Sequence, residues 1–347
     1  TPALRYQSWG FRFGKENLKS KILLMIEALV NRLLSILSDG EFHSGEDLGA
    51  SLGMSRAGIW KLLQKLEADT GLTILKLRGK GYKLERPLLL LDEAFLQRSH
   101  DELGWNCHVL TTIDSTNAEA FRELNRSEHR PQLYIAEQQT AGRGRRGRFW
   151  SSPFGLNIYY TLMLPFVAGI QGLSGLSLTV GLAVADLLED IGVAEVSLKW
   201  PNDVHVQGEK VAGILLEMRG DPADICYVAI GVGLNVNMLD SFDQLSCEWT
   251  SLARLNGREF DRNTLICALS RKLHSYLARH ASSGFSSLRE YWESYSSWTG
   301  REVLLQCGED VFAGVMLGLG DDGSLRLSTP EGERAFTGGE VSLRLLS

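Results

Sequence analysis

The spacing of apolar residues near the N-terminus predicts three helices. Over Ile22–Leu37 apolar residues recur every three to four positions, which is the period of a helix with one buried face. Ser44 and Ser55 each stand where a helix N-cap is expected, and Gly53 and Gly71 stand where those two helices would end. Two short helices joined at a tight glycine turn are typical of a helix-turn-helix.

A strand–turn–strand pattern follows these helices. Thr73–Leu77 and Tyr82–Leu84 flank Arg78-Gly-Lys-Gly81, which would form a basic hairpin tip. This order predicts a winged helix-turn-helix over residues 25–86, and we expect it to bind DNA. A helical module that docks onto another protein is the alternative. The expected DNA contacts are the second N-cap, the outer face of its helix and the wing tip: Ser55, Arg56, Trp60, Lys61, Lys65 and Lys80.

Beyond residue 86 the pattern changes to mixed helix and strand. Two longer helices are expected at Ser177–Ile191 and Arg262–His280. Strands are expected at Val109–Ile113, Leu133–Glu137, Asn157–Leu164, Val196–Lys199, Val211–Glu217 and Tyr227–Val232. The alternation predicts an α+β domain built on a mixed sheet over residues 87–297.

Both ends of the chain differ from this central part. Residues 298–347 hold short strands divided by glycine and aspartate turns, which predicts a small β-barrel. Its strands are expected at Val303–Leu305, Val311–Leu317, Ser324–Leu327, Arg334–Phe336 and Val341–Leu345. Residues 1–24 belong to no clear domain and are expected to be a disordered extension without a function of its own.

Composition is that of an ordinary globular protein. The 347 residues are 44% hydrophobic and 22% charged, which fits two or three domains. No apolar run approaches the ~18 residues that a membrane helix needs, and no secretory signal is evident. The five cysteines form no C-x-x-C pair, which argues against a disulfide framework and a structural zinc site. We therefore expect a cytoplasmic protein that does not bind membranes.

Charge is distributed unevenly along the chain. The net charge is −6, which by itself disfavours a nucleic-acid partner. Residues 1–86, however, hold 14 basic and 9 acidic residues, a net charge of +5, whereas residues 87–347 have a net charge of −11. A basic segment joined to an acidic body indicates one region that meets an anionic polymer, although a solvated basic face would have the same charge.

The densest motif is Gly142-Arg-Gly-Arg-Arg-Gly-Arg148, with three glycines and four arginines in seven residues. Glycines allow the backbone to approach a ligand, and arginines supply forked donors for phosphate or carboxylate. Four crowded cations repel one another unless an anion neutralises them. We therefore expect a loop that binds a phosphorylated or carboxylated ligand and that is mobile without it. A nucleic-acid patch or a localisation signal is the alternative.

Four further polar segments accompany this arginine loop. Asp114-Ser-Thr-Asn117 follows a strand, and Lys199-Trp-Pro-Asn-Asp203 gathers a cation, an amide and a carboxylate. Lys210-Val-Ala-Gly213 opens a strand with a second lysine, and its glycine is expected to leave room for a ligand. Gly231-Val-Gly-Leu-Asn235 ends another strand with small residues and an amide. Each segment alone would be structural; their joint occurrence indicates a binding site.

Taken together, these motifs resemble the bacterial biotin–protein ligases that also repress the biotin operon. The resemblance runs from about residue 29 to the C-terminus, and the arginine loop with Lys199–Asp203 is its most specific part. It implies a catalytic domain of the class II synthetase type and an SH3-like C-terminal barrel. It also implies that biotin and MgATP form biotinyl-5′-AMP, and that biotin then passes to one lysine of the biotin carboxyl carrier protein of acetyl-CoA carboxylase.

The resemblance also implies residue roles. Lys210 would contact the biotin carboxylate and the α-phosphate, and Lys199 and Arg145 would screen the triphosphate. Asp203 would bind Mg²⁺ or orient the incoming lysine, and both roles stay open. Biotin would be held by Ser115, Thr116, Asn117, Gln139, Gly142, Arg143, Gly144, Arg145 and Lys210. The adenylate would be held by Asn202, Asn235, Trp249 and Arg344.

The same resemblance implies that biotinyl-AMP promotes a homodimer, which presents two winged helices to operator DNA. Three alternatives remain. The first is a lipoate ligase or octanoyltransferase with the same type of catalytic domain. The second is a ligase without repressor activity. The third is a DNA-binding sensor with a degenerate ligase domain.

Overall fold

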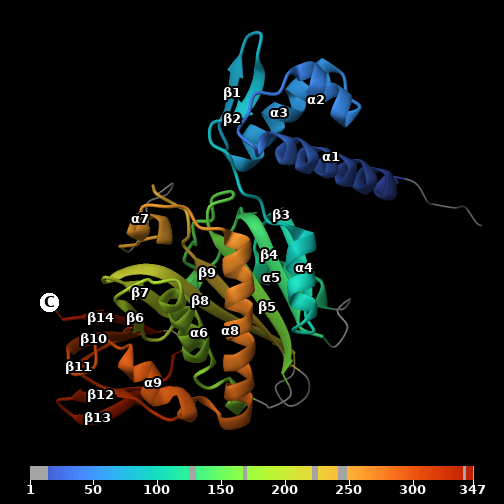
Figure 1. Ribbon diagram of the computed structural model, residues 1–347. Helices are drawn as coiled ribbons and strands as arrows, with labels where there is room; N and C mark the ends of the chain where they lie inside the picture. Colours follow the sequence, from blue (N-terminus) through green and yellow to red (C-terminus); the bar gives the residue numbers. More distant parts are fainter. Residues whose placement is uncertain are drawn as a thin grey trace, which may run out of the picture. The chain divides into compact units, whose positions relative to one another are not determined.

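Figure 1 shows the fold in a computed structural model, which describes residues 15–124, 130–166, 170–220, 226–240, 248–338 and 341–346. The chain divides into two compact units, Thr1–Leu88 and Leu89–Ser347. The first unit ends two residues after the predicted boundary at residue 86. Among the described residues, no helix is both long and apolar enough to cross a membrane.

The first unit is a winged helix-turn-helix, as predicted. Ser44 Oγ accepts a hydrogen bond from Asp47 N at 3.0 Å, and Ser55 Oγ accepts one from Gly58 N at 3.2 Å. Each bond satisfies an amide that the first helical turn leaves without a partner, so the predicted caps are confirmed. The elements are α1 (Lys15–Leu37), α2 (Gly45–Leu52), α3 (Arg56–Thr70), β1 (Ile74–Leu77) and β2 (Gly81–Leu84).

The N-terminal boundary differs from the prediction. Helix α1 begins at Lys15, so residues 15–24, which were expected to be disordered, form its first part. The physical reason is local, since lysine, glutamate and leucine are good helix formers and no glycine or proline interrupts them. Residues 1–14, the rest of the expected extension, lie outside the described residues.

The second unit is built on a seven-stranded sheet in the order β3-β4-β5-β9-β8-β7-β6. Only β3 and β4 run parallel; every other neighbouring pair is antiparallel. The predicted strands are confirmed, and β7 was missed because its four residues lie between two motifs. The strands are β3 (Asn106–Ile113), β4 (Gln132–Gln139), β5 (Ile158–Phe166), β6 (Val196–Lys199), β7 (Asp203–Val206), β8 (Glu209–Gly220) and β9 (Cys226–Leu234).

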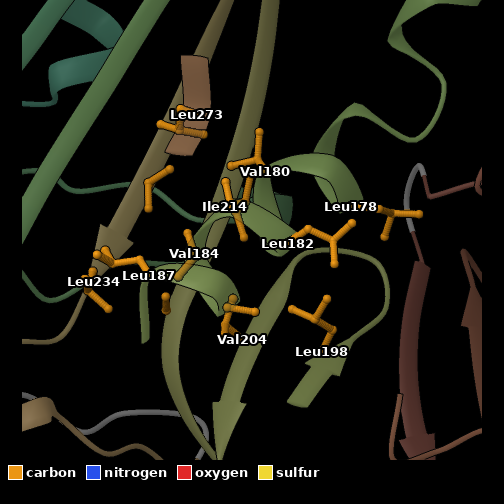
Figure 2. Packing of buried hydrophobic residues seen from close by; sticks show 14 of the residues in the cluster. Leu178, Val180, Leu182, Val184, Leu187, Leu198, Val204, Ile214, Leu234 and Leu273 are labelled. Carbon is orange, nitrogen blue, oxygen red and sulfur yellow. The ribbon is translucent and has the colours of Figure 1, made fainter. Parts of the chain in front are cut away.

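Helices cover the two faces of this sheet unequally. Side chains alternate along the strands, so on β4 the neighbours Leu133 and Tyr134 enter different apolar clusters. The larger cluster packs α6 and α8 on the sheet, and Figure 2 shows Val184 of α6 near Ile214. The smaller cluster packs α5 on the opposite face. The helices are α4 (Glu93–Asp101), α5 (Thr116–Arg122), α6 (Leu176–Asp190), α7 (Leu252–Asn256), α8 (Arg262–Ser283) and α9 (Arg289–Ser294).

The C-terminal strands form a second sheet within the same unit. It is antiparallel throughout, in the order β13-β12-β11-β10-β14, with a bulge between Met316 and Gly318. Among the described residues β13 and β14 do not pair, so the predicted barrel is observed as a sheet that is not closed. Its strands are β10 (Glu302–Cys307), β11 (Asp310–Leu319), β12 (Leu325–Thr329), β13 (Gly332–Phe336) and β14 (Val341–Leu345).

Hydrogen bonds join this sheet to the part of the unit that is built on the seven-stranded sheet. The Trp200 indole N–H donates to Gly323 O at 3.1 Å, and Glu293 of α9 accepts from Leu319 N at 2.7 Å. Trp200 is 2% exposed. The Lys199–Asp203 segment is therefore held directly against the C-terminal sheet.

Candidate active site and DNA interface

A cavity of about 440 Å³ lies on the α5 side of the seven-stranded sheet. Residues 213, 231 and 233 alternate with core positions of β8 and β9, so all three glycines face this cavity. Segments far apart in the sequence meet here. Of the predicted residues, the lining includes Ser115, Thr116, Asn117, Gln139, Arg143, Gly144, Arg145, Lys199, Asn202, Asp203, Lys210, Asn235 and Trp249.

Lys210 and Asp203 form an ion pair inside the cavity. Lys210 Nζ lies 2.7 Å from Asp203 Oδ1, and the two side chains are only 18% and 21% exposed. Adjacent antiparallel strands, β7 and β8, place them together. The ammonium also lies 5.3 Å from the centroid of the Trp150 ring. This half-buried cation can meet an anionic group of a ligand while the carboxylate keeps it in place.

Trp150 fills the space above the cavity glycines. A Cβ at Gly233 would overlap the indole, and a Cβ at Gly213 would lie 3.1 Å from it and 3.2 Å from Lys210 Nζ. Gly213 faces the cavity, and a side chain there would crowd Trp150 and Lys210, while the expectation that its missing side chain leaves room for a ligand stays a prediction. Only its position directly after the arginine loop singled Trp150 out in the sequence.

The arginine loop is a short hairpin. Trp150 N donates to Gly142 O at 2.9 Å, and Gly144 N donates to Arg148 O at 2.7 Å. The turn Arg145–Gly147 contains Arg146 with a positive φ of 58°, an uncommon conformation outside glycine. These bonds define one geometry for the loop, and its expected mobility without a ligand stays a prediction.

Two loop arginines have specific acceptors across the cavity. Arg143 donates to Glu217 Oε2 at 2.9 Å. Arg145 donates to Asn202 Oδ1 at 2.9 Å and to Gly338 O at 2.7 Å. Burial lowers the pKa of the Arg145 guanidinium, and the nearby Asp203 carboxylate opposes that shift. Arg145 thus links the loop, the Lys199–Asp203 segment and the C-terminal sheet.

Neutral polar side chains, held in part by the Glu217 carboxylate behind them, line the end of the cavity near α5. Gln139 Oε1 accepts from Thr116 N at 2.9 Å, and Asn117 Nδ2 donates to Glu217 Oε2 at 2.8 Å. Thr161 Oγ1 lies 2.6 Å from Asn117 Oδ1. Sequence reasoning missed the roles of Thr161 and Glu217, since each belongs to a strand whose pattern indicated only a core.

Asn235 and Trp249 form another wall. Asn235 Nδ2 donates to Thr250 O at 3.0 Å, so this amide holds the chain segment that carries Trp249. Lys210 N donates to Glu248 O at 3.2 Å, which pairs the same segment with the start of β8. The Arg254 guanidinium lies 4.6 Å from the Trp249 ring centroid. Trp249 therefore presents an aromatic surface to the cavity.

Three predicted site residues have other positions or partners. Gly142 is not in the lining, because its backbone packs against Trp150 O and closes the hairpin. Arg344 on β14 is exposed and outside the lining, whereas its neighbours Ser342 and Leu343 belong to it. Lys199 lines the cavity with its ammonium 4.7 Å from the Trp298 ring centroid.

The described part of the cavity offers few protein ligands for a metal ion. Within the described residues no group of three or more histidine, cysteine, aspartate or glutamate side chains could hold an ion. Asp203 offers one carboxylate among cations. One carboxylate together with substrate phosphates suits Mg²⁺, which often retains waters and binds with its nucleotide.

The predicted DNA contacts are all exposed on the surface of the first unit. Ser55, Arg56, Trp60, Lys61 and Lys65 are exposed along α3, and Lys80 is exposed in the wing turn. Lys65 Nζ is paired with Asp69 at 2.7 Å, whereas Lys80 Nζ lies 5.9 Å from the Phe42 ring centroid. A basic second helix and a basic wing on one small domain suit a groove and its flanking phosphates.

Comparisons with known proteins agree with this arrangement. Residues 30–83 match an HTH domain, residues 109–235 the Biotin/lipoate A/B protein ligase family, and residues 299–344 the Biotin protein ligase C terminal domain. The chain is 38% identical over 317 residues to the bifunctional ligase/repressor BirA of Escherichia coli K12, covering 90% of this chain and 96% of that protein.

A more distant relative and a solved structure extend the comparison. The bifunctional ligase/repressor BirA of Bacillus spizizenii is 31% identical over 312 residues, covering 87% of this chain and 94% of that protein. The structure of a biotin protein ligase from Aquifex aeolicus in complex with biotin and ATP superposes with a TM-score of 0.60 at 33% identity. It covers 69% of this chain and 99% of that chain.

Proposed function

The chain belongs to the family of bifunctional ligase/repressors named BirA, and on that premise we propose a two-step ligation. A carboxylate oxygen of biotin attacks the α-phosphorus of ATP, the bond to the bridging oxygen breaks, and pyrophosphate leaves. The ε-amine of one lysine on a biotin carboxyl carrier protein then attacks the acyl carbon of biotinyl-5′-AMP. AMP leaves, an amide forms and one proton is released.

The observation that carries this proposal is the Lys210–Asp203 pair inside a cavity with cations on one side and neutral amides on the other. The first step brings a carboxylate to a triphosphate, so fixed positive charge is its main requirement. Lys210 faces the reacting carboxylate and α-phosphate, while Lys199 and Arg145 offset the remaining phosphate charge. The neutral donors and acceptors near α5 suit the uncharged ureido ring of biotin.

Mg²⁺ bound to ATP would add positive charge to the phosphates, and Asp203 is the cavity carboxylate suited to hold it. Alternatively, in the second step the same carboxylate would orient the incoming lysine and accept the proton that its ammonium must lose before the ε-amine attacks. Arg143 would move with the loop as it closes over biotin. The closed loop would exclude water from the reactive anhydride. Trp249 would stack on the adenine side, with Asn202 and Asn235 keeping their strand ends in register.

The repressor activity links this site to the first unit. We propose that biotinyl-AMP orders the arginine loop and favours a homodimer, which places two α3 helices on two half-sites of operator DNA. We propose that the protein acts in the cytoplasm, where operator DNA would be within reach of the first unit. The described cysteines Cys107, Cys226, Cys267 and Cys307 are free thiols.

The deciding experiment is transfer of labelled biotin to a purified carrier domain with MgATP. Incorporation that requires biotin, ATP and carrier supports the ligase. Pyrophosphate release with lipoate but not biotin would instead identify a lipoate ligase. No transfer, with DNA binding intact, would identify a sensor with a degenerate ligase domain.

Repression has its own test. Sedimentation with and without biotinyl-AMP measures dimer formation, and footprinting upstream of biotin-synthesis genes measures operator protection. Adenylate-dependent association and protection are expected. If ligation proceeds while neither is seen, the chain is a ligase without repressor activity.

A further inference from the structure

The outer face of α3 carries an aromatic side chain that does not pack in the domain core. Trp60 is 47% exposed, although its neighbour Ile59 is fully buried. Burial of apolar surface is favourable by roughly 25 cal/mol per Å², so burying the exposed half of this indole against a partner would stabilise the complex. A single exposed aromatic residue is not by itself a binding site, so its place on the second helix of a helix-turn-helix is what gives it meaning.

The charges around Trp60 restrict the partner. Arg56 and Gln64 lie one turn before and after it, and Lys61 is adjacent; all three are exposed. Lys65 is neutralised by Asp69 at 2.7 Å. For Arg56 and Lys61 the part of the chain that is described contains no ion pair. The free cations thus surround the N-terminal half of α3, and the partner must be anionic as well as partly apolar.

The fold decides where this surface would lie on DNA. In a helix-turn-helix, side chains near the N-terminus of the second helix contact base edges, while lysines along the flanks meet phosphates. Trp60 is the fifth residue of α3, on its solvent side. The floor of the major groove exposes one apolar group, the 5-methyl of thymine.

We propose that Trp60 determines the operator preference of this chain by packing its indole against a thymine methyl group in the major groove. The inference rests on the proposed DNA interface and assigns base recognition within it. Lys61 contacts a phosphate, and Gln64, whose amide both donates and accepts, faces the next base pair towards the C-terminus of α3.

The test uses the full chain in the presence of biotin and MgATP. The protein first selects its preferred duplex from a random pool. Each thymine of that duplex is then replaced by deoxyuridine, which removes only the methyl group. Replacement at one position per half-site is expected to weaken binding of the wild type by about three- to tenfold. Trp60→Ala should bind the two duplexes equally, and Trp60→Phe should keep most of the difference.

Two further variants separate recognition from general effects. Lys61→Ala should weaken binding to all duplexes alike and keep the methyl effect. Phe95→Ala removes an aromatic side chain on α4 that is 38% exposed, and it should change neither affinity nor preference. Thermal unfolding of Trp60→Ala should match the wild type, because an exposed side chain contributes little to the core.

The outcomes are distinct. If Trp60→Ala keeps the wild-type sensitivity to deoxyuridine, Trp60 does not recognise the methyl group and the inference fails while DNA binding stands. Equal weakening of every sequence by Trp60→Ala also refutes it, because that result indicates a general contact. If the wild type selects no sequence, the DNA interface itself is refuted, and Trp60 then belongs to a protein-docking surface.

Discussion

Two cationic regions of this molecule meet anions in different ways. Along α3 and the wing, Arg56, Lys61 and Lys80 are exposed side chains on a regular scaffold. In the arginine loop, Arg143 hydrogen-bonds to Glu217 on β8, and Arg145 to Asn202 in the turn before β7. Polyanion binding needs charge that adapts to phosphates, whereas a transition state needs charge already in position. Under the proposed function, similar residues would serve binding in one unit and chemistry in the other.

The largest effect is expected from Lys210→Ala, which removes the central positioned cation. Adenylation should fall well over tenfold, since the lost contact contributes more than ~1.4 kcal/mol in the transition state. Biotin-dependent pyrophosphate release measures it. The matched control is Lys272→Ala, another lysine 2.7 Å from an aspartate, Asp190, but outside this cavity. Near-normal activity of Lys210→Ala would refute its role and much of the comparison.

Gly233→Ala tests whether the position of Trp150 helps to fix the geometry of the cavity around the arginine loop. The added methyl would overlap the indole, and overpacking of this kind costs about 1–3 kcal/mol. Biotin affinity, measured by calorimetry, should fall by roughly tenfold. Gly181→Ala in α6 is the control, because its methyl would meet only Leu198 at 3.4 Å. Equal behaviour of the two variants would show that Trp150 does not constrain the site.

Lys61→Ala tests the exposed cations of the first unit, which are proposed to bind DNA phosphates. Losing one phosphate contact should weaken DNA binding a few-fold and reduce the slope of log affinity against log salt by about 1. Adenylation should be unchanged. Titrations of a DNA duplex at several salt concentrations provide the slope. A slope equal to that of the wild type would mean that Lys61 lies away from the phosphates.

The smallest effect is a pH dependence of the stability of the second unit. Burial lowers the pKa values of His100 and His280, so folding favours their neutral forms. The unfolded chain then binds protons first, and stability present above about pH 6.5 is lost as pH falls through the lower folded values. Calorimetry at pH 8 and pH 5 should show a lower unfolding temperature for the larger unit at pH 5. An unchanged temperature would contradict this assignment.

Short-range signals explain which parts of the fold were predictable. The N-caps Ser44 and Ser55 act within three residues, so the sequence locates the starts of α2 and α3 correctly. Strand β7 escaped detection because it begins inside the Lys199–Asp203 motif and ends shortly before the motif that Lys210 opens. Helix α5 was also missed, since its cap Ser115 makes no side-chain capping bond and its first turn carries the polar motif.

The sequence by itself determined the local elements, the basic charge of the first unit and the set of motifs that marks the site. Only the tertiary structure decided how those motifs meet. Arg145 reaches Gly338, and Asn117 and Arg143 share the carboxylate of Glu217, across separations of 74 to 193 residues. Caps and periodicity act over a few residues, whereas these contacts depend on strand order and packing. The position of the Trp150 indole against Gly213 and Gly233 is another contact that only the packing of separate strands decides.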